Sequence, residues 1–517
     1  MTARPSSPMA APAGVGLVRW TAPAAVFVIA LLVFLRTLLP GQAFDDWGEM
    51  QVVPHVLGIP HPTGYPTYVL AAWLFELLPF GSVAFRANLF AAVDVAFALA
   101  MVTSIAQRLG VRPVVAAGAA IATGATGTIW ASAVVAEVNA LHLAFIALIL
   151  ERSLAWAQHR RFRDLALGGL LIGLSMGNHV LTAFVAPYAI LFVLWAGRDQ
   201  FRANPRWLMA PVATMALGAA VYLYLPIAAS LQPPLPYNGP TTPEAFLYLV
   251  TGMQFSGQYG GLFTPEGPVR LATSMPALWE LALARANALV PLLAALGFLV
   301  LLRRHRAFAL VLGATILTGA YIWANYLRLE HYLLVAWMAC GVLVAVALDG
   351  LARVLAALLR GRARPLPTVV AGAAGVALAA MLVVTNLPAA DMSHERGADD
   401  FSSALFAALP ANAALLSFWG PSPALWYAQL VDGKRPDVLI VDDTNIVYEG
   451  WGTREARIAS LICTRPVYAL RSSGQDLVTM QADYTTTEVG RFMVGALGPT
   501  AEYEIPLWLV QPRAGCP

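Results

Sequence analysis

Residues 44–68 read FDDWGEMQVVPHVLGIPHPTGYPTY and form a dense polar stretch between two apolar segments. The stretch holds three carboxylates, Asp45, Asp46 and Glu49, together with two histidines and four prolines. Proline fixes its backbone dihedral φ, so the four prolines stiffen this loop. The flanking sequence is largely aliphatic. A polar patch of this density therefore needs an explanation, and a position at the boundary between membrane and water would provide one.

The composition of the whole chain is that of a membrane protein. Of its 517 residues, 59% are hydrophobic and 12% are charged, whereas soluble domains carry about 25% charged residues. Apolar runs long enough to cross a bilayer recur along the sequence. A formal net charge of +3 is too small to indicate a nucleic-acid partner. The sequence therefore predicts a polytopic α-helical membrane protein and excludes a single large soluble domain.

Eleven stretches are predicted to cross the membrane as helices. The short apolar segment 65–80 contains Glu76, and we expect it to lie in the membrane interface instead of spanning the bilayer. The two legs of the hairpin around Asn178-His179 are short for a full crossing, so we expect its tip in a polar cavity below the outer surface. The predicted spans are residues 22–40, 85–106, 113–130, 133–151, 164–178, 180–197, 207–229, 286–302, 307–325, 332–350 and 367–386.

The arginines test this arrangement, because short cytoplasmic loops of membrane proteins are enriched in basic residues. If segment 65–80 does not span, one side of the membrane receives Arg108, Arg112, Arg152, Arg160, Arg161, Arg163, Arg198, Arg202, Arg206, Arg303, Arg304, Arg306, Arg353, Arg360, Arg362 and Arg364. The other side receives only Arg36, Arg86, Arg270, Arg285 and Arg328 before the C-terminal part. The larger group marks the cytoplasmic side, so the polar stretch and the C-terminus are predicted outside the cytosol.

The predicted organisation has three parts. Residues 1–20 form a cytoplasmic tail, residues 21–386 form the transmembrane domain, and residues 387–517 form an extracytoplasmic domain. Within the transmembrane domain, residues 41–84 are a first external loop with the interfacial helix. Residues 230–284 are a second external loop with helical potential around residues 243–251.

The C-terminal part differs in pattern from the transmembrane domain. Short buried strands alternate there with helical stretches, which indicates a small α/β domain with a partly parallel sheet. No Gly-rich phosphate fingerprint follows any strand, so a nucleotide site is not indicated. The predicted strands are residues 413–418, 438–441 and 467–470, and the predicted helices are residues 424–431 and 454–462.

The three cysteines show no spacing typical of a metal site. Cys340 lies in an apolar run and reads as a small core residue. Cys463 and Cys516 lie in the polar C-terminal part and are disulfide candidates if that part is outside the cytosol. No group of His, Asp and Glu has convincing metal-ligand spacing either, although an acid-bound Mg²⁺ or Mn²⁺ at the three acids of the polar stretch is left open.

For Asp45, Asp46 and Glu49, a solvated loop is the commoner role of external carboxylates. However, three crowded acids should raise the pKa of at least one of them, and a carboxylate held at the lipid–water boundary could deprotonate a hydroxyl as a general base. His61 could orient a carboxylate or contact a phosphate, or it could only lock the turn of residues 61–64. From spacing alone, a catalytic role and a structural role of these residues are equal alternatives.

Further polar residues are predicted on the same side. Glu137 and the Asn178-His179 tip are expected at the depth of the polar stretch, and an ionisable group there is a functional candidate. Arg86, Arg328 and His331 are expected near the outer interface, where a lipid phosphate would lie. Arginine forks suit phosphate oxygens, but the same side chains could snorkel or cap a helix.

Asp46-Trp47-Gly48-Glu49, followed by LGIPHPTGYPTY at 57–68, resembles the D-x-G-E … L-G-I-x-H-P-P-G-Y-P-x-Y signature of a family of multi-pass membrane proteins. That family has long been labelled as of unknown function in bacteria. It also contains a eukaryotic protein O-mannosyltransferase and belongs with the GT-C glycosyltransferases. The resemblance covers about the first half of the chain and continues at residues 77–81, 85–89, 136–138, 177–179 and 222–227.

The resemblance implies a GT-C fold and an inverting transfer of a sugar, a hexose such as mannose. The donor would be a polyprenyl-phosphate-linked sugar, and the acceptor would be a hydroxyl of a protein, lipid or glycan outside the cytosol. On this pattern Asp46 takes the position of the general base, with Asp45 and Glu49 as supports. Two positions depart from the family's pattern, Asn139 in place of tyrosine and Ala228 in place of arginine. The substrate-binding candidates are His61, Tyr65, Arg86, Glu137, Asn178, His179, Arg328 and His331.

Two other functions are alternatives to a transferase. A lipid-linked glycan carrier or flippase would place ionisable groups near the bilayer midplane and often shows repeated halves, whereas the polar residues here gather at one interface and no repeat is visible. A non-catalytic partner in glycan assembly would use the C-terminal domain for docking. For all three functions we expect a multi-pass protein of the bacterial plasma membrane.

Overall fold

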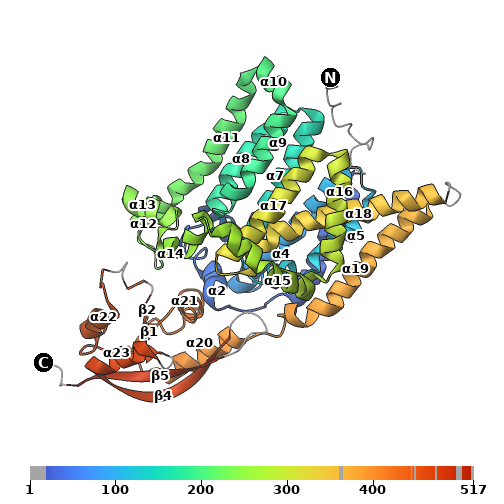
Figure 1. Ribbon diagram of the computed structural model, residues 1–517. Coiled ribbons are helices and arrows are strands. Elements are labelled where there is room, and N and C mark those ends of the chain that lie inside the picture. The colour runs from blue at the N-terminus through green and yellow to red at the C-terminus, as the bar shows by residue number, and fades with distance from the viewer. Residues whose placement is uncertain are drawn as a thin grey trace.

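The computed structural model describes residues 19–359, 365–443, 445–446, 450–471, 474–495 and 503–513. It consists of a large helical bundle with a small α/β domain packed at one end (Figure 1). Nearly all of the predicted cytoplasmic tail lies outside the described residues, as do Arg360, Arg362, Arg364 and Cys516.

The bundle contains helices long and apolar enough to cross a membrane, which makes the chain a multi-pass membrane protein. Among the described residues six qualify, or seven if a bent pair counts as one span. The six are α4 (Val83–Arg108), α7 (Val138–His159), the run Pro205–Ser230, α17 (Arg306–Asn325), the run Glu330–Leu358 that contains α18 (Leu334–Leu358), and α19 (Leu366–Ala390). The bent pair is α15 (Gly267–Ala286) and α16 (Leu289–Arg304), which meet at 106°.

Several apolar helices of the bundle are shorter. They are α1 (Thr21–Thr37), α5 (Pro113–Gly124), α8 (Phe162–Asn178) and α9 (Thr182–Ala196). The run Pro205–Ser230 is built from η2 (Pro205–Leu208), α11 (Met209–Ala219), η3 (Ala220–Leu223) and α12 (Tyr224–Ser230). The helices of the bundle lie at the positions of the eleven predicted stretches, but several of them are too short to count as spans by length. The number of eleven spans therefore stays a prediction.

Two predicted helix boundaries are wrong, and both errors affect the site. The stretch 113–130 is not one helix, since α5 ends at Gly124 and a short α6 (Gly127–Ala131) follows it. Helix α7 begins at Val138 instead of residue 133, because the Glu137 side chain caps its first turn by accepting a hydrogen bond from the backbone N–H of Asn139. An apolar run carries no mark of such a break, so periodicity could not find it.

Residues 44–68 fold into two short helices and a turn. Helix α2 (Asp45–Val52) starts with the acids, and α3 (Pro66–Glu76) is the helix expected in segment 65–80. A side chain at Gly48 would lie 2.2 Å from the carbonyl oxygen of Ala43 and 3.0 Å from Cβ of Pro423. Only glycine therefore lets α2 lie so close to α21 (Ser422–Leu430) of the C-terminal domain, as Figure 1 shows.

The second predicted loop, residues 230–284, is largely helical. Helix α13 (Pro243–Val250) confirms the helical potential expected there, and η4 (Met253–Phe255), α14 (Ser256–Tyr259) and η5 (Gly260–Phe263) follow it. The twenty-residue helix α15 was not predicted. Its Pro276 and charged residues at several positions weaken the apolar pattern, so the sequence reads as a loop.

The C-terminal domain has a five-stranded sheet in the order β2-β1-β3-β5-β4. The strands β1 (Ala414–Ser417), β2 (Leu439–Asp442) and β3 (Val467–Leu470) pair in parallel, as predicted, with β1 between the other two. Strands β4 (Tyr484–Val494) and β5 (Tyr503–Pro512) add an antiparallel pair that was not predicted. Strand β4 is threonine-rich and mostly exposed, and β5 contains a proline, so neither has the apolar alternation of a typical strand.

Four helices accompany this sheet. They are α20 (Gly397–Ala408), α21, α22 (Arg454–Leu461) and α23 (Gln475–Asp483), and α21 and α22 match the two predicted helices. Two apolar clusters form the core of the domain, one built mainly by α20, α21 and Phe44 of the first loop, the other by α22 and α23. Cys463 is disulfide-bonded, while its predicted partner lies outside the described residues. Cys340 is free and buried, as expected of a core residue.

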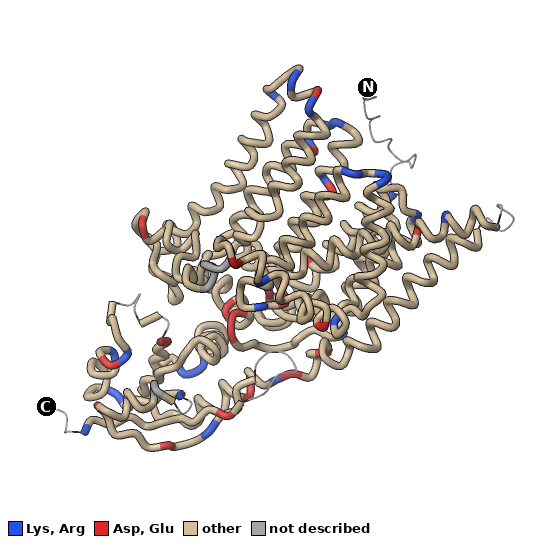
Figure 2. Tube along the Cα trace, viewed as in Figure 1, with Lys and Arg blue, Asp and Glu red and all other residues tan. Residues whose placement is uncertain are grey.

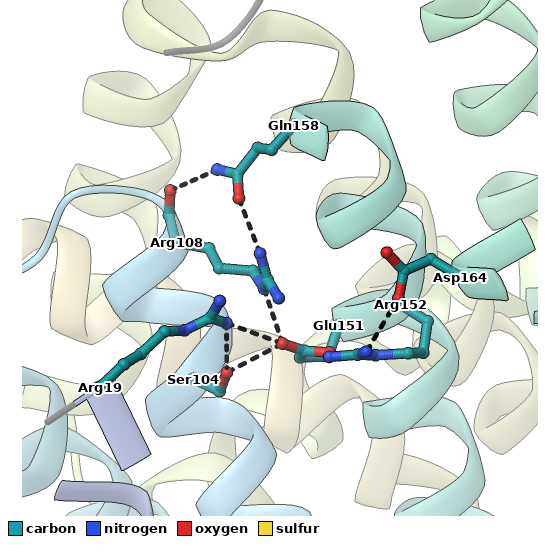
Figure 3. A network of polar contacts seen from close by, with 7 residues as sticks. All are labelled: Arg19, Ser104, Arg108, Glu151, Arg152, Gln158 and Asp164. Carbon is teal, nitrogen blue, oxygen red and sulfur yellow. Dashed lines mark hydrogen bonds and ion pairs between the residues drawn. The ribbon is translucent and has the colours of Figure 1, made fainter. Parts of the chain in front are cut away.

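A buried polar network ties the opposite end of the bundle together (Figure 3). The Glu151 carboxylate of α7 is fully buried and accepts hydrogen bonds from Arg19, Arg108 and Arg152. Arg152 also reaches Asp164 at 3.0 Å, which brings α8 into the network. Figure 2 shows basic residues gathered at this end, around the tip formed by α10 (Arg198–Ala203) and away from the C-terminal domain.

Candidate active site

A cavity of about 1210 Å³ lies at the end of the bundle that faces the C-terminal domain. Its walls come from the first loop, the start of α7, the tip between α8 and α9, residues 322–332 and one residue of the C-terminal domain, Trp419. Of the predicted site residues, the cavity brings together Asp45, Asp46, His61, Tyr65, Glu137, His179, Arg328 and His331. Glu49 and Asn178 lie just behind this wall, and Arg86 lies elsewhere.

The three acids at the start of α2 have different surroundings. Asp46 and Glu49 are three residues apart and lie on the same face of α2, but the Asp46 side chain is 58% exposed and the Glu49 side chain is 2% exposed. The Oδ1 atom of Asp46 accepts a hydrogen bond of 2.6 Å from the indole N–H of Trp419. Asp46 is thus the accessible carboxylate of the three at the cavity wall.

Asp45 is half-buried beside Asp46. Burial, and to a smaller extent the negative charge of Asp46, raises the pKa of Asp45 to about 6. Its backbone N–H donates to the carbonyl of Gly420 in the C-terminal domain, at 2.9 Å. The expectation that crowding raises the pKa of at least one acid holds for this residue, with burial as the larger cause.

His61 joins the buried Glu49 to the cavity. Its Nδ1 atom pairs with Oε2 of Glu49, and its backbone N–H donates to Oε1 of the same carboxylate at 2.8 Å. Burial disfavours the imidazolium, but Glu49 and Asp46 outweigh it and raise the pKa of His61 to about 9. The Nε2 atom lies 3.1 Å from the Tyr65 hydroxyl and 4.0 Å from Oδ2 of Asp46. Glu49 therefore holds a cationic imidazole close to the exposed acid.

Tyr65 and the turn before it fix the direction of this imidazole. The Tyr65 hydroxyl donates to the carbonyl of Pro62 at 2.9 Å, and the backbone of Tyr65 is left-handed with φ of +37°. The ring lies 5.8 Å from that of His179, so Tyr65 links the first loop to the tip between α8 and α9.

Glu137 and His179 lie in neighbouring walls, as the shared depth predicted. The indole N–H of Trp47 donates to Oε2 of Glu137 at 3.0 Å, while the other carboxylate oxygen caps α7. Nδ1 of His179 accepts from the backbone N–H of Leu181 at 3.1 Å, which leaves Nε2 free to face other groups. Asn178 instead supports the tip by donating to the carbonyl of Val138 at 3.1 Å.

Arg328 and His331 also line the cavity. Arg328 is exposed there, donates to the Ser274 hydroxyl at 3.2 Å and lies over the Trp323 ring, and His331 is close by. Arg86 does not line this cavity, since its guanidinium donates to the carbonyls of Phe80 and Gly81 at 2.9 and 2.8 Å. These two carbonyls belong to the loop between α3 and α4, so Arg86 holds that loop and does not face the cavity.

Asp46, Glu49 and His61 are the set that could hold a metal ion, with ligand atoms within 4.8 Å of one another. Asp45 is not part of this set, although the sequence suggested the three acids together. Two carboxylates and an imidazole suit a divalent transition metal. Glu49 already pairs with Nδ1 of His61, and Nε2 of His61 contacts the Tyr65 hydroxyl, so a bound cation stays a prediction.

Sequence reasoning missed several residues of the cavity, among them Trp419, Arg285 and Glu330. Trp419 comes from the C-terminal domain, and Arg285 pairs through two hydrogen bonds of 2.9 and 2.8 Å with Glu330. Arg285 was counted only as an external arginine. The position of Trp419 directly after a predicted strand was the one available signal, because loops at the carboxyl ends of parallel strands commonly carry binding residues.

Residues 46–203 match the model of the family described as "Protein O-mannosyl-transferase TMEM260 N-terminal domain". The chain is 27% identical over 462 residues to the protein O-mannosyl-transferase TMEM260 of Mus musculus, which covers 84% of this chain and 64% of the mouse protein. It is 25% identical over 231 residues to the protein O-mannosyl-transferase tmem260 of Dictyostelium discoideum, covering 40% of this chain and 27% of the relative. The chain therefore spans less than two thirds of the length of these curated relatives.

The fold agrees with that of a solved enzyme. ArnT from Cupriavidus metallidurans, in a crystal structure bound to undecaprenyl phosphate, superposes with a TM-score of 0.53 at 14% identity, covering 95% of this chain and 98% of ArnT. The match includes the C-terminal part, so the predicted combination of a helical membrane domain with a small sheet domain is confirmed. This chain is thus a multi-pass membrane protein that is similar in sequence to the TMEM260 protein O-mannosyl-transferases and has the fold of ArnT.

Proposed function

We propose that this chain is a membrane glycosyltransferase that moves a sugar, a hexose such as mannose, from a polyprenyl-phosphate carrier to an acceptor hydroxyl. The observation that carries the proposal is the Asp46 carboxylate, which is exposed at the wall of a cavity that Arg328 also lines. The naming of both curated relatives as O-mannosyl-transferases supports the reaction class. The ArnT structure bound to undecaprenyl phosphate supports a lipid-linked donor.

In the proposed reaction, Asp46 acts as the general base. Its Oδ2 atom takes the proton of the acceptor hydroxyl as that oxygen attacks the anomeric carbon of the sugar. The bond between that carbon and the phosphate oxygen breaks, and its electrons leave with the polyprenyl phosphate, so the configuration inverts. The donor already carries its activation, so no nucleotide is needed at the site.

We assign Arg328 and His331 to binding the phosphate of the donor. Arg328 offers a guanidinium that can bind phosphate oxygens in a fork, and His331 lies beside it. The imidazolium of His61, held by Glu49, lies near Asp46 and stabilises the ionised carboxylate before proton transfer. Asp45, Glu137, His179 and Tyr65 complete the wall, as substrate contacts or supports of the base.

We place the cavity and the C-terminal domain outside the cytosol, in the plasma membrane of a bacterial cell. Basic residues at the far end of the bundle, around the tip formed by α10, support this orientation (Figure 2). The three-part organisation into residues 1–20, 21–386 and 387–517 is part of the same proposal.

A reconstituted system tests the function. The purified protein in liposomes would receive a polyprenyl-phosphate sugar labelled in the sugar, together with candidate acceptors, and both product and label position would be followed. We expect a glycosidic product and free polyprenyl phosphate without transbilayer movement of the donor. Movement of the donor without any glycosidic product would contradict a transferase and establish the carrier instead.

A further inference from the structure

Trp419 connects the C-terminal domain to the acid that we assign as the base. It lies in the loop between β1 and α21, at the carboxyl end of the central strand of the parallel part of the sheet. Its indole N–H donates to Oδ1 of Asp46 at 2.6 Å, across a sequence separation of 373 residues. Asp46 has no bond of that length to any other residue of the described chain.

The Trp419 ring is held on several sides. It meets His61 edge-on with ring centres 5.6 Å apart, Tyr237 at 6.0 Å and Trp426 at 6.1 Å. The ring therefore lies between the first loop, the second loop and its own domain. Such packing leaves the indole little freedom to turn away from Asp46.

The backbone around this contact is fixed as well. The N–H of Asp45 donates to the carbonyl of Gly420 at 2.9 Å, so the residues next to Asp46 and Trp419 bond to each other directly. On the far side of the interface the hydroxyl of Tyr427 accepts from the N–H of Ala84 at 2.9 Å. The C-terminal domain is thus bound to the membrane domain at the loop that carries the base.

Resting on the proposed function, we propose that the C-terminal domain completes the active site through Trp419, a positioning residue that fixes the carboxylate of Asp46. The indole occupies Oδ1, so Oδ2 is the oxygen left to face an acceptor hydroxyl. A hydrogen bond to a carboxylate favours its ionised form, and a base held in one orientation meets the reacting hydroxyl with less loss of freedom. Substrate does not need to touch Trp419 for this role.

The first test replaces Trp419 with phenylalanine, which keeps a ring and removes the N–H. We expect kcat to fall about 10- to 100-fold with little change in the KM of the donor, and the acid limb of the pH–rate profile to move to higher pH. Trp508→Phe is the matched control, since the indole of Trp508 donates to the carbonyl of Arg471 within the same domain and away from the cavity. Parent-like kcat and pH profile in W419F would overturn the proposal while leaving the transferase function intact.

The second test does not depend on activity. In protein with ¹⁵N-labelled tryptophan, the indole N–H signal that W419F removes is expected to shift in Asp46→Asn and to stay in place in Asp400→Asn, an exposed acid of α20. If this signal does not shift in Asp46→Asn, the contact between Trp419 and Asp46 is contradicted. A parent protein that transfers no sugar would overturn the positioning role together with the proposed function, whatever the signal does.

Discussion

His61 is the residue whose charge depends most on its neighbours in the site. Glu49 lies behind it, fully buried, and Asp46 lies in front of it, exposed to the cavity. Burial also raises the pKa of Glu49, while the contact with His61 opposes that rise. The arrangement keeps a positive charge beside Asp46 without exposing a second carboxylate.

This pair predicts how stability depends on pH. The pKa of His61 is about 9 in the folded protein, against about 6.5 in an unfolded chain. The folded state binds this proton more tightly, so the stabilisation is complete below about pH 6.5 and is lost as the pH rises through about 9. In detergent, the melting temperature of the parent should therefore fall more steeply over this range than that of His61→Gln. Equal slopes for the two proteins would contradict the assigned charge.

Part of the residue-level site was accessible from the sequence. The acids of α2, His61, Glu137 and His179 are polar in apolar surroundings, and membrane burial makes such residues conspicuous. The pairing of Glu49 with His61 was not accessible, because it depends on the turn at residues 61–64 and not on spacing. The role of Arg86 also required the structure, since binding a phosphate and holding a loop have the same sequence signature.

At the scale of elements, α2 is the piece that joins the two domains. Its N-terminal residues bond to the loop after β1, and its Gly48 approaches the backbone of Ala43 and the side chain of Pro423. A helix of eight residues has little stability of its own, so its position depends on these contacts.

Gly48→Ala is expected to displace α2. The added Cβ would lie 2.2 Å from a backbone oxygen, which cannot move as a side chain can. We expect a lower melting temperature and at least about a tenfold loss of transfer, because the base moves with the helix. Gly168→Ala, at a helical glycine of α8 with no atom within 4 Å of the added Cβ, is the control. A fully active G48A would show that α2 can shift without consequence.

Elements with regular patterns were predicted well, and irregular ones were not. Strands β1 to β3 and helices α21 and α22 lie within two residues of expectation, because short apolar runs between polar helices have few other interpretations. The break before α7 and the helix α15 were missed. In both places the hydrophobic pattern does not show where the helix lies. Glu137 caps α7 inside an apolar run, and Pro276 and charged residues interrupt the apolar pattern of α15.

At the scale of the whole molecule, the two ends of the bundle have opposite character. One end carries the cavity, and the other carries Glu151 with its three arginines (Figure 3). Helix α7 joins the two ends. Glu137 is its N-cap residue, and Glu151 lies three to four turns later, about 20 Å along the axis. At each end, charged side chains pair with groups of opposite charge. Apolar helices span the distance between the two ends.

Glu151→Gln is expected to lower stability strongly. Removing the anion leaves buried guanidinium groups without their partner, a change that typically costs about 3–5 kcal/mol. A lower melting temperature in detergent would be the measurement, with Glu244→Gln as control because Glu244 is exposed on α13. If E151Q melted with the parent, the network would not contribute to stability.

The orientation in the membrane can be tested with single cysteines. Cys340 is buried and Cys463 is disulfide-bonded, so an added thiol at an exposed position should dominate labelling. Thr487→Cys on β4 is expected to react with an impermeant reagent added outside intact cells, and Ala203→Cys on α10 only after the cells are opened. The reverse pattern would contradict both the arginine argument and the external site.

The central claim, that Asp46 is the base of a sugar transfer, is tested most directly by the transfer rate of Asp46→Asn in liposomes supplied with a polyprenyl-phosphate sugar. The amide keeps the shape and cannot accept the proton, so the rate should fall by at least about 100-fold. Asp199→Asn, exposed on α10 at the opposite end, should transfer like the parent. A correctly folded D46N with an unchanged rate would contradict the account.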